Sequence, residues 1–224
     1  MPIISVSEAV ATRRSVRAFL DRPVELAVLE RIMQKAQMAP SGCNYQPWEA
    51  TILTGEPLRD LQQAMLRTPF QEPREYVVQP EGIPAEYHRR LGEITGARLA
   101  AEGVARDDAE ARAAIVHNNF TSYGAPVVLF CYLPRIMGPP QWSDVGMWLQ
   151  TIMLLLLEEG LDSVPQEFLS HHGRLIKNHL GISDESHIFF CGLGIGYADK
   201  SAPSYLYQRT RIPYREAVRF RGFQ

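Results

Sequence analysis

The sequence has few cysteines and no long hydrophobic run. Its three cysteines, Cys43, Cys131 and Cys191, are widely spaced and form no CxxC pair, so neither a disulfide framework nor a cysteine-rich zinc site is expected. The longest apolar segments, 125–133 and 151–157, fall far short of the roughly 20 residues that a membrane-spanning helix needs. The N-terminus shows no signal-peptide pattern, and we therefore expect a cytoplasmic protein.

An excess of charge of either sign is also missing. The 23 Lys and Arg residues nearly balance the 25 Asp and Glu residues, for a formal net charge of -2. This balance indicates neither a nucleic-acid-binding protein nor one that binds a membrane surface. With 224 residues, 46% of them hydrophobic, the chain can bury a substantial core, and no internal repeat divides it. We expect one domain over residues 1–224.

The common catalytic motifs are absent as well. There is no GxSxG, Walker, HExxH or protein-kinase pattern, and the pair His171–His172 lacks metal-ligand spacing, so no metal site is expected. The glycines of segment 192–196 lie in a strand-like run near the C-terminus, where they would let a helix or a flat ligand approach a sheet. Because no nucleophile or acid–base pair stands out, an enzyme with this sequence would take its reactivity from a cofactor.

Hydrophobic periodicity predicts more helices than strands, without strict alternation, which favours an α+β fold. The expected strands cover residues 49–54, 126–133 and 187–197. The expected helices begin at Ser5, after Pro23 and after Gly55, and then cover 85–102, 107–122, 143–159 and 173–180, with Asp107 and Ser143 as N-caps.

The strongest local motif is the run RRSVR over Arg13–Arg17, at the end of the first expected helix. Three guanidinium groups and a hydroxyl offer many donors to a phosphate or a carboxylate, several of them bidentate. The alternative is a solvated basic turn. A second basic element, Arg209-Thr-Arg211, lies near the other end of the chain. It strengthens the interpretation as an anion site only if the two ends meet in space.

Two short segments are candidate binding loops. In Pro40–Trp48, small and amide side chains lie between two prolines, and Ser41, Asn44 and Gln46 could hydrogen-bond a polar ring edge or a polyol chain. A turn whose side chains cap their own backbone is the alternative. In Val164–Glu167, a proline-stiffened turn would present backbone N–H groups to a cofactor edge, although an ordinary connection has the same pattern.

Taken together, these segments resemble the FMN-dependent nitroreductase family nearly end to end, and most of all its nitrobenzoate-reductase-like branch. The resemblance runs in order through RRSVRAF, APSGCNYQPWEATIL, APVVLF, SDVGMWLQTIMLLLLEEGLDSVPQE, GLGIGY and RTRIPYREAVRFRGF. It implies an α+β homodimer with a central, mostly antiparallel sheet flanked by helices and two FMN sites at the subunit interface. The C-terminal arm, residues 198–224, would extend onto the partner subunit.

The resemblance also implies a reaction. NADPH or NADH would reduce FMN and leave before a small aromatic acceptor, a nitro compound or a quinone, binds in a ping-pong sequence. The flavin N5 would carry the chemistry, so no side chain is expected to be catalytic. The alternatives are a reductive dehalogenase or a flavin-fragmenting relative on the same fold, or a flavin-binding protein without turnover.

The cofactor-binding residues that the resemblance implies are Arg13, Arg14, Ser15, Arg17, Pro40, Ser41, Asn44, Asn118, Pro165, Gln166, Glu167, Arg209 and Arg211. Arg13 and Ser15, joined by Arg209 and Arg211, would hold the phosphate and the ribityl chain. Arg17 would sit at the pyrimidine carbonyl, where a cation stabilises the negative charge that accumulates on reduction. Ser41 and Asn44 would approach from the partner subunit. The turn at Pro165–Glu167 would aim a backbone N–H at N5, with Glu167 preferred over its neighbour Gln166.

This sequence departs from the family at one position. Many members carry an Asn and a Lys shortly before the strand that matches 126–133, whereas residues 117–120 read HNNF. Asn118 or Asn119 is therefore the candidate for that flavin contact. The aromatic residues Phe120, Tyr123 and Trp142 would line an acceptor pocket, with a place in the core or the dimer interface as the alternative.

Overall fold

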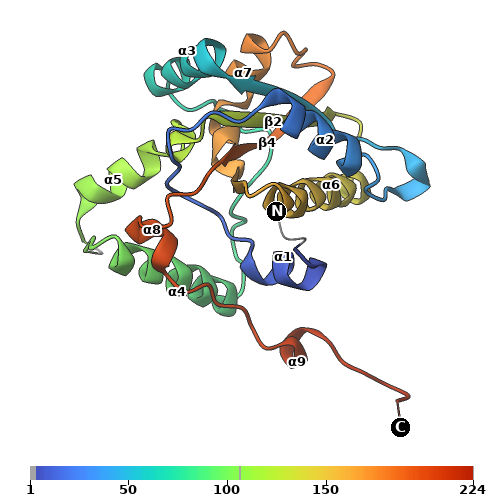
Figure 1. Ribbon diagram of the computed structural model, residues 1–224, viewed down its shortest axis with the longest axis vertical. Helices are drawn as coiled ribbons and strands as arrows, with labels where there is room; N and C mark the ends of the chain where they lie inside the picture. The colour runs from blue at the N-terminus through green and yellow to red at the C-terminus, as the bar shows by residue number, and fades with distance from the viewer. Residues whose placement is uncertain (1–3, 106, 224) are drawn as a thin grey trace.

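The centre of the fold is a four-stranded sheet, seen in a computed structural model that describes residues 4–105 and 107–223 (Figure 1). The strands are β1 (Glu49–Thr54), β2 (Val127–Pro134), β3 (Asp162–Gln166) and β4 (His187–Gly196). Their order is β1-β2-β4-β3, and every neighbouring pair is antiparallel. The predicted α+β class with an antiparallel sheet is confirmed.

Helices cover both faces of this sheet, and further helices lie away from it (Figure 1). They are α1 (Val6–Thr12), α2 (Leu26–Ala36), α3 (Gly55–Arg67), α4 (Ala85–Ala101), α5 (Ala109–His117), α6 (Pro139–Glu158), α7 (Gly173–His179), α8 (Pro203–Leu206) and α9 (Tyr214–Ala217), with 3₁₀ turns η1 (Gly42–Asn44), η2 (Ser122–Gly124) and η3 (Glu167–His172). Within the residues that the structure describes, no helix has the length and apolar character needed to cross a membrane.

The side chains of β2 divide the core into two layers, because successive residues of a strand point to opposite faces. Its odd-numbered residues from Val127 to Leu133 belong to a cluster with buried residues of α2 and α6. Val128 and Phe130 belong to a second cluster with residues of α3, α7 and η3. The strand is therefore buried on both faces, as its continuous apolar sequence predicts.

Helix α6 begins earlier than predicted. We expected Ser143 to cap it, but the helix starts at Pro139, and the N–H of Gly138 donates to the Gln141 side chain at 3.1 Å. Prolines fit in the first turn of a helix because the N–H groups of that turn have no partner within the helix. The two prolines that suggested a loop therefore belong to the helix.

Helix α5 is shorter than predicted. Its N-cap is Asp108 rather than Asp107, since the Asp108 carboxylate accepts the N–H of Ala111 at 2.9 Å. The helix ends at His117 and does not continue to residue 122. Ser122, the last residue of the predicted helix, has a left-handed backbone conformation with φ of 50°, which a right-handed helix does not accommodate.

Strand β3 was not predicted, because a turn was expected at Val164–Glu167. Pro165 instead lies opposite Leu193 of β4. Among the four strands β3 is at the edge, where a residue without an N–H donor is tolerated. On the free side of β3, Ser15 forms a parallel bridge with Ser163. This pairing brings the arginine-rich segment to the edge of the sheet.

Gly192 allows η3 to approach the sheet closely. A Cβ atom at this glycine would lie 2.5 Å from Cδ1 of Leu169, which is closer than two carbon atoms can pack. The role predicted for these glycines, close approach of another element, is confirmed at this position. It places η3, and with it Glu167, directly against β4.

The proline-rich segment 69–84 is attached to the rest of the fold by buried polar contacts. The fully buried Lys177 donates to Glu75 Oε1 at 2.6 Å, and Arg135 donates to the same oxygen at 2.6 Å. The main-chain N–H of Gln71 donates to the carbonyl oxygen of His171 at 2.8 Å. Gln71 and Glu75 thus attach the first half of this segment to α7 and η3.

Candidate functional site

The structure brings the two arginine-rich segments together. The C-terminal segment that follows α8 passes between α1 and α4 (Figure 1), and the Arg209 guanidinium donates to the carbonyl oxygens of Ala11 and Arg13. Arg13, Arg209 and Arg211 line a cavity of about 420 Å³ with Val10, Ala11 and Gln150. The condition under which the sequence favoured an anion site, that the two ends meet, is fulfilled.

These arginines lack carboxylate partners. Within residues 4–105 and 107–223, no Asp or Glu forms an ion pair with Arg13, Arg14, Arg17, Arg209 or Arg211. Burial lowers the pKa of Arg13 from its ordinary value, and the charges of Arg209 and Arg211 lower it further. The pKa of Arg209 is also lowered, by burial and then by Arg14 and Arg211. A bound anion would relieve this repulsion.

Tyr205 of α8 and Tyr207, which directly follows that helix, contact Arg14, and Tyr207 also contacts Arg17. Arg14 Nη2 donates to the Tyr207 carbonyl oxygen at 2.5 Å, and Arg17 Nη1 donates to the Tyr207 hydroxyl at 2.8 Å. The Arg14 guanidinium carbon lies 4.5 Å from the ring centre of Tyr205 and 5.2 Å from that of Tyr207. Neither tyrosine was predicted as a site residue, although aromatic residues two apart before a basic pair are a usable signal.

A chain of contacts continues from Arg17 to β3. The Arg17 guanidinium carbon lies 5.9 Å from the ring centre of Tyr123, and the Tyr123 hydroxyl donates to Asn119 Oδ1 at 2.9 Å. Gln166 Nε2 in turn donates to the carbonyl oxygen of Asn119 at 2.8 Å. Together with Tyr207, these residues come from four segments that are far apart in the sequence and meet at one place.

Several buried polar atoms of this group have no partner among the described residues. They include Nε of Arg14, Nε of Arg17 and Oε1 of Gln166. An unpaired buried polar group is costly, and such groups at a cluster of charges are typical of a ligand site. The arginines thus offer positively charged hydrogen-bond donors, and Gln166 offers a hydrogen-bond acceptor.

Arg17, Asn118 and Tyr123 share a second cavity of about 220 Å³, which is also lined by Glu102, Ile115, Pro203 and Ser204. The backbone here is strained, because Ser122 and Tyr123 both have positive φ, 50° and 56°. Asn118 is exposed, and its side chain borders the cavity. The strained turn places the Tyr123 ring beside Arg17.

The remaining residues at the edge of β3 lie around this group. Ser15 is half-buried, and its carbonyl oxygen accepts from Arg17 Nη1 at 3.2 Å. Pro165 and Glu167 are exposed on either side of the buried Gln166. The exposed Pro165 and Glu167 thus flank Gln166, which is hydrogen-bonded to Asn119.

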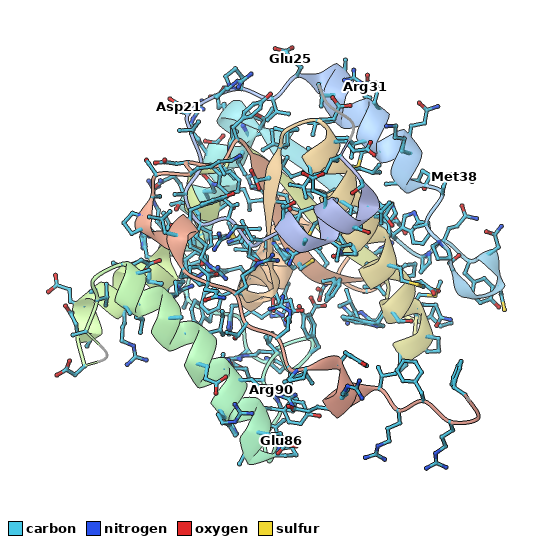
Figure 2. All side chains as sticks on the ribbon, turned by 60° about the horizontal axis from the view of Figure 1, so that its bottom comes forward. Asp21, Glu25, Arg31, Met38, Glu86 and Arg90 are labelled. Atoms are coloured by element: carbon cyan, nitrogen blue, oxygen red, sulfur yellow. The ribbon has the colours of Figure 1, made fainter. Side chains whose placement is uncertain are left out.

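Basic residues extend from the first cavity onto α4. A cavity of about 540 Å³ between α4 and the C-terminal segment is lined in part by Arg89, Arg90 and Arg211. Figure 2 shows Arg90 on the side of α4 beside that segment. Arg89 is paired with Glu93 at 2.5 Å. Arg211 therefore lies between two cavities.

Pro40, Ser41 and Asn44 lie apart from the arginines within this chain. Figure 2 shows Met38 where the chain leaves α2, and Figure 1 shows the loop that follows at the end of α6 away from α4 and α8. Ser41 Oγ accepts the N–H of Gln46 at 3.1 Å, as the self-capping alternative predicts. The exposed Asn44 has a left-handed backbone with φ of 57°.

The N-terminal part of α6 holds this loop in place. The N–H of Gly42 donates to both carboxylate oxygens of the buried Asp144 at 3.2 Å. Trp142, two residues earlier, donates from Nε1 to the Met137 carbonyl oxygen at 3.2 Å and packs against Tyr76 and Phe190. Trp142 therefore lies at the same end of α6 as the residue that holds the loop, and its ring packs on Tyr76 and Phe190.

Phe120 is a core residue. It is buried, belongs to the cluster of Val128 and Phe130, and lies 5.5 Å from Phe168 and 5.1 Å from His172 between ring centres. Of the three aromatic residues considered for an acceptor pocket, Tyr123 is the one that lines a cavity with Arg17. Among the described residues, no group of three or more His, Cys, Asp or Glu side chains could hold a metal ion.

Comparison with known proteins agrees with this geometry. The chain matches the model of the Nitroreductase family over residues 10–197. It is 33% identical over 218 residues to a 4-nitrobenzoate reductase of Pseudomonas putida, covering 96% of this chain and 94% of that protein. The crystal structure of the FMN and NADPH-dependent nitroreductase NfnB from Sphigopyxis sp. strain HMH is 46% identical, with a TM-score of 0.93 over 98% of this chain and 100% of that one.

A more distant structure has the same fold. The FMN-dependent nitroreductase NfnB from Mycobacterium smegmatis, in complex with NADPH, is 25% identical. Its TM-score is 0.88, over 97% of this chain and 100% of that chain. The family model covers most of the sequence, and the relatives match it along almost its whole length. The chain belongs to the nitroreductase family.

Proposed function

We propose that this chain is an FMN-dependent oxidoreductase that passes hydride from NADPH or NADH to nitroaromatic, nitrobenzoate-like acceptors or to quinones, by a ping-pong mechanism. The observation that carries the proposal is the arginine cluster, which joins both ends of a nitroreductase-family chain without carboxylate partners in the described residues. The similarity to a 4-nitrobenzoate reductase and to FMN and NADPH-dependent nitroreductases supports the acceptor, the cofactor and the donor. The three free cysteines suit a cytoplasmic enzyme.

The residues present fit FMN. A phosphomonoester carries about -1.5 to -2 charge at neutral pH, which matches the guanidinium groups of Arg13, Arg209 and Arg211 around one cavity. The unpaired Nε of Arg17 and Oε1 of Gln166 suit the alternating acceptors and donors of the flavin pyrimidine edge. FMN, when bound, supplies the two-electron chemistry at N5.

Each segment of the site then has a task. Arg13, Arg14 and Ser15 with Arg209 and Arg211 hold the phosphate and ribityl end. Arg17 keeps a positive charge at the pyrimidine edge, where a fixed cation stabilises the charge that arrives with hydride, and Asn118 borders the same cavity. The main chain of Pro165–Glu167, fixed through the bond of Gln166 to Asn119, offers an N–H to N5, with Glu167 as the donor.

The other side of the site comes from a partner subunit. Pro40, Ser41, Asn44 and Trp142 share one end of α6, and in a homodimer they reach the flavin and the acceptor of the other chain. The single domain, residues 1–224, ends in an arm, 198–224, that extends onto the partner. Support comes from its apolar side chains, since Phe220 is 66% exposed and Phe223 is 80% exposed.

One anaerobic titration tests the proposal. The visible spectrum of the purified protein is recorded as NADPH and then 4-nitrobenzoate are added. We expect a yellow protein that loses its colour with NADPH and regains it with the nitro compound. A protein that neither contains nor takes up FMN would contradict the proposal.

The same titration separates the alternatives. A yellow protein that NADPH does not bleach would be a flavin-binding protein without turnover. Bleaching followed by release of halide from halogenated phenols, with no reaction of 4-nitrobenzoate, would indicate a dehalogenase. Breakdown of the flavin itself under oxygen would indicate the flavin-fragmenting reaction.

A further inference from the structure

Tyr207 contacts two arginines of the cluster through two different groups. Its carbonyl oxygen accepts from Arg14, and its hydroxyl oxygen accepts from Arg17 Nη1 at 2.8 Å. Tyr207 is 9% exposed, so water competes little for either bond. Hydrogen bonds from a charged donor are strong in such an environment.

Arg17 has few other restraints. Its Nη1 also donates to the Ser15 carbonyl oxygen at 3.2 Å, a longer bond, and the Tyr123 ring centre lies 5.9 Å from its guanidinium carbon. In the described part of the chain its Nε has no partner and no carboxylate pairs with it. A long side chain in this position needs a fixed acceptor to hold one orientation.

We propose that the Tyr207 hydroxyl is a positioning group for Arg17. It directs the guanidinium toward the cavity shared with Asn118 and Tyr123, and thereby sets how much positive charge the pyrimidine edge of FMN meets. The inference rests on the proposed function, because it concerns the same site. It assigns a role in tuning the flavin to a residue of the C-terminal segment whose own side chain need not touch the flavin.

The variant Tyr207→Phe isolates this role. It keeps the aromatic ring near Arg14 and the main-chain carbonyl oxygen that accepts from Arg14. It removes only the hydroxyl oxygen that accepts from Arg17. We expect a more negative flavin midpoint potential and anaerobic bleaching by NADPH that is about three- to tenfold slower, as for one lost hydrogen bond. The dissociation constant of FMN should stay within about twofold, since the bonds of Arg14 and Arg209 remain.

Tyr197→Phe is the matched control. It removes the same atom from a tyrosine whose ring also packs on an arginine, Arg22 at 3.7 Å, outside the arginine cluster. The midpoint potential of the flavin in this control should equal that in the wild type. In an Arg17→Ala background, Tyr207→Phe should not change the potential further, because the hydroxyl acts through Arg17. If the Tyr207 hydroxyl had a purely structural role, Tyr207→Phe would lower the midpoint of unfolding by the same amount in the wild type and in Arg17→Ala.

The outcomes separate this inference from the proposed function. An unchanged potential and bleaching rate in Tyr207→Phe, beside a wild type that NADPH bleaches, would overturn the positioning role alone. A Tyr207→Phe protein that loses FMN would also overturn it, because the hydroxyl would then serve retention of the cofactor. A wild-type protein that binds no FMN would overturn the proposed function and this inference together.

Discussion

At the residue scale, the arginines of the cluster differ in what they contact. Arg209 bonds the main chain of α1 and the residue after it, so it contributes to the fold as well as to the charge. Arg17 contacts Tyr207 and Tyr123 and lines the smaller cavity. Arg211 is exposed and lines the larger cavities. Substitutions at these positions should therefore have separable effects.

Arg17→Ala should alter the redox behaviour of the flavin while FMN stays bound. Removing the cation from the pyrimidine edge lowers the midpoint potential, and we expect bleaching by NADPH to slow about 10- to 100-fold, the loss of one charge-assisted contact. Arg22→Ala is the control, because Arg22 packs on the Tyr197 ring at 3.7 Å and lines none of the site cavities described above. The measurements are the midpoint potential of the flavin and the rate of its bleaching by NADPH. No change in either quantity would refute the role of Arg17.

Arg211→Ala should weaken binding of FMN but not of riboflavin. Its guanidinium donates to the Thr210 carbonyl oxygen at 2.7 Å, so its removal takes away charge with little loss of packing. We expect the dissociation constant of FMN to rise about tenfold or more, because a charge-assisted phosphate contact is lost. Fluorescence titrations with both flavins measure this, with Arg215→Ala on α9 as the charge-matched control. Equal losses for FMN and riboflavin would argue against a phosphate contact.

The sequence predicted the members of the arginine cluster but not how they are held. Charge in a short run is visible in the sequence, and so Arg13–Arg17 and Arg209–Arg211 were found. The contacts of Tyr207 depend on where the chain passes after α8, and no local pattern encodes this. For the same reason the sequence could not distinguish Phe120 from Tyr123. Phe120 is buried in the core, whereas Tyr123, three residues later, lines a cavity.

At the element scale, η3 connects the site to a buried pair of histidines. Phe70 from the proline-rich segment stacks on His171 with ring centres 4.6 Å apart, and both ring nitrogens of His172 are buried without a partner in the described residues. Burial lowers the pKa of both histidines below the ordinary value of 6.5, and Arg74 and His171 respectively lower them further. The folded conformation of η3, which carries Glu167, is thus more stable when the two imidazole rings are neutral.

Acid should therefore destabilise the protein through η3. The unfolded chain takes up protons near pH 6.5, whereas the folded chain resists until the lowered pKa is reached. The stabilising effect of the neutral rings is complete above pH 6.5 and is lost as the pH falls from there through the folded pKa, at up to about 1.4 kcal/mol per pH unit for each proton.

The measurement is the free energy of unfolding in urea between pH 7.5 and 5.5, in wild type and His172→Asn. The variant loses packing at every pH, but its stability should depend less steeply on pH. His88→Asn, on the exposed surface of α4, should keep the slope of the wild type. Parallel curves for wild type and His172→Asn would rule out this linkage.

Elements with a strong local pattern were predicted well, and elements defined by distant partners were not. Strands β1, β2 and β4 are apolar or rich in β-branched residues, and their bounds agree with the prediction to within one residue. Strand β3 has five residues and contains Pro165, so it exists because β4 and Ser15 pair with it. The early start of α6 at Pro139 was missed because prolines suggest a loop unless they occupy a first turn.

At the scale of the whole molecule, the residues of the proposed site lie in two distant regions of the chain's surface. The arginines, Tyr123 and β3 lie together, and the loop of Ser41 and Asn44 lies at the far end of α6 (Figure 1). A homodimer in which each loop completes the partner's site accounts for this division, and its mass in sedimentation would be twice 25.3 kDa. The isologous pairing then places two equivalent sites on the two sides of the interface.

Mixing two defective chains tests this division directly. Arg17→Ala impairs the arginine side, and Asn44→Gly removes the amide of the loop while glycine tolerates its left-handed backbone. If Asn44 serves the partner's site, a heterodimer of the two variants has one doubly defective site and one intact site. The heterodimer, purified through two different affinity tags after co-expression, should therefore regain about half of the wild-type rate per dimer. If Asn44 instead serves its own chain, every site carries one defect, and the heterodimer would be no more active than the average of the two variant homodimers.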